Sequence, residues 1–93
     1  MTVRRLEAVV SGRVQGVGFR EFVRHEATTR GIAGYVRNSD DGRNVEVVAE
    51  GEEGALQTLV DALHSGPRFA RVEQVDVTYS DPNLGFSKFS VEL

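Results

Sequence analysis

Three glycines and two arginines fall within the nine residues Gly12-Arg13-Val14-Gln15-Gly16-Val17-Gly18-Phe19-Arg20. Glycine adopts positive φ at little cost, so such a segment can turn back on itself with its backbone N–H groups facing inward. If a helix begins where the stretch ends, its unpaired N–H groups and the positive end of its dipole lie at the same place. The guanidinium of Arg20 adds a forked hydrogen-bond donor there. Together these groups predict a site for a small, doubly charged oxyanion such as phosphate.

Two common nucleotide-binding motifs do not match this stretch. A Walker loop needs a lysine and a hydroxyl residue directly after its last glycine, and here Phe19 and Arg20 follow Gly18. The dinucleotide fingerprint G-x-G-x-x-G would begin at Gly16 and would require a glycine where Glu21 stands. The stretch therefore predicts the binding of a small anion and not of a nucleotide.

The elements that must position this loop follow from the hydrophobic periodicity. Alternating or continuous apolar residues predict strands at residues 6–11, 32–39, 45–50 and 74–79, and a short last strand at 88–93. Apolar stripes at helical spacing predict helices at residues 19–30 and 51–65. Right-handed crossovers then place both helices on one face of a four-stranded antiparallel sheet, with the C-terminal residues as a short extra strand. The predicted fold class is a ferredoxin-like α+β sandwich of βαββαβ order.

Length and composition exclude several classes of protein. The 93 residues suit a single domain over 1–93, and without cysteine there is neither a disulfide nor a cysteine zinc site. The formal net charge of −3 argues against a large nucleic-acid footprint, which needs a dominant basic face. The apolar runs are too short to cross a membrane. We therefore expect a cytoplasmic globular protein with no nucleic-acid or membrane partner.

Two sequence motifs narrow the function further. Residues 12–20 match the pattern G-x-V-x-G-V-x-F/Y-R, and residues 34–42 match G-W/F/Y-V-x-N-x-x-D-G, with Asn38 as the asparagine. Together, at this separation, the motifs resemble those of the acylphosphatase family over essentially the whole chain. The resemblance implies a stand-alone enzyme that hydrolyses the carboxyl–phosphate bond of acyl phosphates to a carboxylate and inorganic phosphate.

The resemblance also implies a role for each site residue. It assigns the phosphate to the guanidinium of Arg20 and to the loop backbone, that is to Gln15, Gly16, Val17, Gly18, Phe19 and Arg20. It assigns the attacking water to Asn38, whose amide can orient a water but does not titrate and so is no strong base. An acyl phosphate has a good leaving group, so positioning and charge stabilisation suffice. We expect no metal ion and no cofactor, a small-molecule acyl phosphate as substrate, and a monomeric enzyme.

One position departs from the family pattern. The pattern usually runs D-G-x-V-E, whereas residues 41–46 read Asp-Gly-Arg-Asn-Val-Glu, which is one residue longer. The extra residue follows the turn signal at residues 40–42, so it predicts a bulge or a longer hairpin loop. Because Asn38 lies on the same hairpin, the pairing register there decides whether Asn38 reaches the loop.

Other functions are compatible with parts of this pattern. A non-catalytic phosphate-binding or anion-binding ferredoxin-like module would share the loop but would not hydrolyse acyl phosphates. An RNA-binding domain of the same fold is disfavoured because residues 45–50 contain no aromatic side chain. Acylphosphatase-like domains also begin larger hydrogenase-maturation proteins. Asn38 beside a hairpin turn could by itself be a turn residue, and only its place in the second motif favours a role in catalysis.

Overall fold

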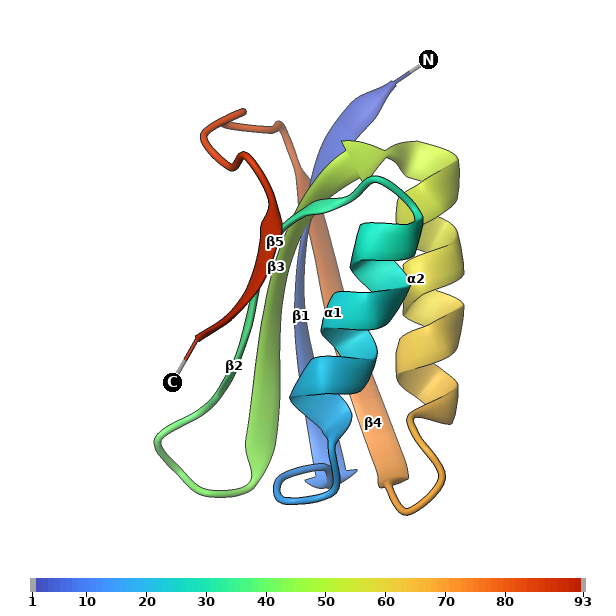
Figure 1. The fold of residues 1–93 in the computed structure, drawn as a ribbon, viewed down its shortest axis with the longest axis vertical. Coiled ribbons are helices and arrows are strands. Elements are labelled where there is room, and N and C mark those ends of the chain that lie inside the picture. The colour runs from blue at the N-terminus through green and yellow to red at the C-terminus, as the bar shows by residue number, and fades with distance from the viewer. Residues whose placement is uncertain (1, 93) are drawn as a thin grey trace.

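A five-stranded sheet with two helices packed on one of its faces makes up the computed structural model, which describes residues 2–92 (Figure 1). The elements in chain order are β1 (Val3–Arg13), α1 (Phe19–Thr29), β2 (Ala33–Asn38), β3 (Asn44–Glu52), α2 (Glu53–Ser65), β4 (Arg71–Ser80) and β5 (Phe89–Glu92). This order and layering confirm the ferredoxin-like α+β sandwich predicted from the sequence.

The sheet has the strand order β4-β1-β3-β2-β5. The first four strands pair antiparallel, as predicted. The extra C-terminal strand, β5, runs parallel to β2, with Val91 opposite Val36, so the complete sheet is mixed. Because of this pairing, β5 lies next to β2, the strand that ends at Asn38. Leu93, the last residue of the predicted strand, lies outside the described residues.

Several predicted boundaries differ from the structure, and for two of them the strand pairing gives the reason. The first strand extends beyond residues 6–11 because β3 and β4 both pair with it along most of its length. The second helix begins at Glu53 and not at residue 51, because β3 continues through Gly51 and Glu52, which pair with Arg4 and Val3. Ladder hydrogen bonds to β1 thus outweigh the preference of carboxylates for a first helical turn.

The core between sheet and helices also holds both ends of the glycine loop. Val14, where the chain leaves β1, and Phe19, where α1 begins, are each 1% exposed. Phe19 joins Val23 and Ala27 as the buried side of α1. Burying a side chain of this size is worth about 1.5–3 kcal/mol. The loop is therefore a short span between two side chains that are fixed in the core.

Glu50 is a buried carboxylate on the sheet face opposite the helices, where the alternation of β3 suggests a solvated side chain. It is 5% exposed because the segment after β4 folds over it. Its carboxylate accepts hydrogen bonds from the backbone N–H groups of Asn83 and Leu84, both at 2.8 Å, and from Arg5 Nη1 at 3.0 Å. Burial acts to raise the pKa of Glu50, but these donors outweigh it and hold the pKa below its ordinary value. Glu50 thereby ties the segment that leads to β5 onto the sheet.

Replacing Glu50 with glutamine is expected to destabilise the fold at neutral pH by about 1–3 kcal/mol, because buried donors lose a charged acceptor. The lowered folded-state pKa means that the ionised form stabilises the fold above the unfolded-chain pKa. That contribution is lost as the pH falls through the folded-state pKa. Urea unfolding of both proteins should therefore show a difference at pH 7 that shrinks as the pH falls through the lowered folded-state pKa of Glu50. Glu7→Gln, at the exposed partner of Arg5, is the control, and a difference independent of pH would contradict the assignment.

Candidate active site

The loop between β1 and α1 has the backbone that the glycines predicted. Gly16 and Gly18 have φ values of 74° and 78°, in the left-handed region that side chains with a Cβ avoid. A Cβ built at either position would meet nothing within 4 Å, so glycine is needed there for conformation and not for space. Gly18 is the N-cap of α1 and provides no side-chain cap. The first-turn N–H groups of α1 are therefore directed towards the mouth of the loop without a capping side chain.

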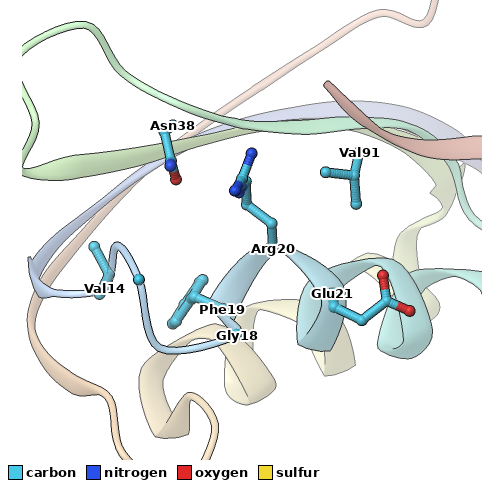
Figure 2. Close-up of a pocket in the computed structure, with 8 residues that line it drawn as sticks. Val14, Gly18, Phe19, Arg20, Glu21, Asn38 and Val91 are labelled. Atoms are coloured by element: carbon cyan, nitrogen blue, oxygen red, sulfur yellow. The ribbon is translucent and has the colours of Figure 1, made fainter. Parts of the chain in front are cut away.

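A cavity of about 220 Å³ opens above this loop. Its walls come from the loop, the first turn of α1, the end of β2, and β5. The lining residues are Val14, Gly16, Gly18, Phe19, Arg20, Glu21, Asn38 and Val91. Figure 2 shows the side chains of Arg20 and Asn38 directed into the same space from α1 and β2. The structure thus brings together residues of both sequence motifs.

Two predicted phosphate-binding residues do not line the cavity with their side chains. Val17 packs against the hydrophobic core. The Gln15 side chain leaves the loop and donates to backbone carbonyls of the β2–β3 hairpin. The side chains of these two residues are therefore engaged elsewhere. In turn, Val91 is a wall residue that the sequence did not reveal, because the pairing of β5 with β2 brings it there.

Asn38 ends β2 on the side of the sheet that faces the helices. It pairs with Val45 of β3, whose side chain is fully buried. Within residues 2–92, its Oδ1 is buried and has no hydrogen-bond partner. A buried polar atom without a partner costs about 1–3 kcal/mol, so such an atom calls for a functional explanation. The Asn38 side chain lines the cavity, where a ligand could complete its hydrogen bonds.

Arg20 reaches the cavity from the first turn of α1. Its Nη1 donates a long hydrogen bond of 3.4 Å to the backbone oxygen of Glu92 in β5. No side-chain carboxylate in the described part of the chain forms an ion pair with it. The guanidinium lies between Asn38 and Val91 in Figure 2. Its charge is thus available to an anion in the cavity.

The acidic residue beside Arg20 is neutralised by a different arginine. Glu21 forms an ion pair with Arg24 one turn further along α1, and Arg24 Nε donates to its carboxylate at 3.0 Å. The hydrogen bond from Arg24 lowers the pKa of Glu21 below its ordinary value. The pair keeps the positive charge of Arg20 uncompensated at the cavity.

The extra residue of the hairpin is taken up in its loop. The β2–β3 ladder runs without a shift from Ala33 opposite Glu50 to Asn38 opposite Val45, which confirms the longer hairpin loop and shows no bulge there. Asp41 organises this loop by accepting the N–H groups of Arg43 at 2.8 Å and Asn44 at 3.1 Å. The Ser39 hydroxyl and the Arg43 N–H lower the pKa of Asp41, so it is a charged acceptor. Asn38 consequently keeps its place beside the glycine loop.

Two other kinds of feature are absent from the described part of the chain. Among residues 2–92, no group of three or more His, Cys, Asp or Glu side chains could hold a metal ion. No helix in the same range is long and apolar enough to span a membrane.

The fold and the cavity define a ferredoxin-like α+β domain with a glycine loop at the N-terminus of its first helix, and this loop lines a cavity. The family model described as acylphosphatase matches residues 6–91. The chain belongs to the acylphosphatase family and is a hydrolase of acyl phosphates, as its two motifs predicted.

Individual relatives agree with this assignment. An acylphosphatase from Salinibacter ruber is 50% identical over 90 residues, which cover 97% of this chain and 94% of that protein. An acylphosphatase from Bacillus subtilis is 52% identical over 83 residues, which cover 89% and 90% of the two chains. The crystal structure of an acylphosphatase from Bacillus subtilis superimposes with a TM-score of 0.92 at 48% identity, covering 97% of this chain and 99% of that one.

Proposed function

We propose that this chain hydrolyses small acyl phosphates in the cavity between the glycine loop, α1 and β2. Arg20 and the backbone N–H groups from Gln15 to Arg20 hold the phosphate, and Asn38 holds the attacking water. One observation carries the proposal: Arg20 and Asn38, from separate elements, line a single cavity above the uncapped start of α1.

The phosphate is held by groups that are already in place. Helix N–H groups and the positive end of the α1 dipole attract an anion, and Arg20 can bind two phosphate oxygens with its forked donors. Charge in a loose phosphoryl-transfer transition state is spread over the equatorial oxygens. Each preorganised donor directed at such charge is commonly worth about 3 kcal/mol of the barrier. Few groups are therefore needed.

Asn38 positions the nucleophile without acting as a base. The water oxygen forms a bond to phosphorus while the bond between phosphorus and the acyl oxygen breaks, and the carboxylate leaves with that electron pair. The carboxylate needs no proton at neutral pH, and a non-bridging oxygen of the phosphate takes the proton of the water. The amide oxygen of Asn38, which has no hydrogen-bond partner within residues 2–92, is suited to accept a hydrogen bond from that water.

Continuous hydrolysis of benzoyl phosphate tests this proposal. We expect release of inorganic phosphate at a rate that excess chelator leaves unchanged, with competitive inhibition by inorganic phosphate. Phosphate binding without hydrolysis would instead favour the non-catalytic anion-binding module. Loss of activity on adding chelator would overturn the metal-free mechanism. Because a single chain supplies every residue of the cavity, we also propose a monomer, which sedimentation of the active enzyme would check.

A further inference from the structure

The side chain of Gln15 connects the two halves of the proposed active site. Its Nε2 donates to the backbone oxygen of Asn44 at 2.8 Å and to that of Ser39 at 3.3 Å. Gln15 lies in the glycine loop, whereas Ser39 directly follows β2 and Asn44 is the first residue of β3. Figure 1 shows that the glycine loop and this hairpin lie at the same end of the molecule. A single carboxamide thus joins the phosphate loop to both strands of the hairpin, directly beyond Asn38.

The hairpin side of this contact is rigidly built. The Asn44 backbone oxygen that accepts the Gln15 hydrogen bond also accepts hydrogen bonds from the Ser39 N–H at 2.9 Å and the Ser39 hydroxyl at 3.0 Å. Asn44 in turn donates through its Nδ2 to Asp41 at 2.7 Å. The contact therefore does not reach a mobile loop tip. It reaches a closed ring of hydrogen bonds, one residue away from Asn38.

We propose that Gln15 is a positioning residue that sets the distance between the bound phosphate and the water held by Asn38. This inference rests on the proposed function. Core packing of Val14 and Phe19 fixes the loop relative to α1, and the β2–β3 ladder fixes Asn38 relative to the sheet. The Gln15 hydrogen bonds join the loop, which is fixed to α1, to the hairpin that carries Asn38. An error of about 1 Å between reacting groups can cost about 100-fold in rate, so a bond at this place affects turnover more than binding.

The longer hairpin loop takes part in this contact. Asn44 lies in the stretch that is one residue longer than the family pattern. Its backbone oxygen accepts the shorter of the two hydrogen bonds from Gln15. The extra residue does not leave the hairpin loose, because Gln15 and Asp41 hold its two ends.

Gln15→Met tests the inference, because methionine has a similar length and no donor. We expect kcat for benzoyl phosphate to fall by about 10-fold to 100-fold while the inhibition constant of inorganic phosphate changes by less than about 2-fold. Gln74→Met is the matched control, since the Gln74 side chain is exposed and bonds only to Asp76 among the described residues, and we expect no change in kcat. An equal loss of phosphate affinity and kcat would overturn the positioning role.

Two further measurements separate positioning from mere support of the loop. In Gln15→Glu, the carboxyl group can donate a hydrogen bond only when protonated, so its kcat relative to wild type should rise as the pH falls. This variant carries the test should Gln15→Met not fold. Combining Gln15→Met with Asn38→Ala should cost no more than Asn38→Ala alone, because both changes remove the same function. Additive losses, or a pH-independent ratio for Gln15→Glu, would overturn the inference. A wild-type protein that does not hydrolyse benzoyl phosphate would instead refute the proposed function.

Discussion

Arg20→Ala is expected to abolish measurable binding of inorganic phosphate and to lower kcat/KM for benzoyl phosphate by at least about 1000-fold. The guanidinium is the one charged donor directed into the cavity among the described residues, and it has no side-chain carboxylate partner there. Its contacts to a phosphate are charge-assisted, and charge-assisted bonds are about twice as strong as neutral ones. The hydrogen bonds from Arg20 also become stronger in the transition state, because charge spreads over the equatorial oxygens.

Two variants make the Arg20 experiment specific. Arg20→Lys retains the charge but not the planar fork, so we expect phosphate binding to return in part and most of the rate to stay lost. Arg30→Ala removes an arginine at the opposite end of α1, where its partner is Glu26. It should leave kcat within about 2-fold of wild type, because neither residue of this pair lines the cavity. If isothermal titration shows unchanged phosphate affinity in Arg20→Ala, the phosphate does not lie where we propose.

Asn38→Ala is expected to keep phosphate binding and to lower kcat by about 100-fold to 1000-fold, the usual effect of removing one preorganised polar group. The side chain touches the water in the proposed mechanism, and the phosphate retains Arg20 and the loop N–H groups. The free energy of unfolding should not fall and can rise, because the change removes a buried oxygen that has no partner within residues 2–92.

Paired measurements on Asn38→Ala and wild type check this combination. Stopped-time hydrolysis of benzoyl phosphate gives kcat, inhibition by inorganic phosphate gives the affinity, and urea unfolding gives the stability. Asn83→Ala, at an exposed position away from the cavity, should change none of the three. Near-normal turnover of Asn38→Ala would rule out its role in positioning the water.

Most of the fold could be predicted because its signals are local. The alternation of β3 and the apolar stripe of α2 appear within single segments, and glycine marks the ends of both helices. The parallel pairing of β5 with β2 is different, since a four-residue strand carries no local sign of its neighbour. For the same reason, the sequence did not place Val91 in the cavity wall.

The site could be predicted only where a residue acts through its own type. Arg20 stands out because a guanidinium at a helix N-terminus suits a phosphate, whereas Asn38 stands out only through its place in the second motif. The contact of Gln15 with Asn44 and the burial of Glu50 depend on how distant segments fold over each other. In both cases the polar side chain bonds to backbone groups, which are the same in every residue and leave no pattern in the sequence.

The burial of Val14 and Phe19 has a consequence for the timing of the reaction cycle. Since both ends of the glycine loop are held in the core, most of the entropy of ordering the loop is lost when the chain folds and little when substrate arrives. A loop that is ordered before substrate binds needs no lid that closes before hydrolysis and opens afterwards. We therefore expect product release to be limited by the departure of phosphate itself, so that the affinity for the product sets an upper bound on turnover.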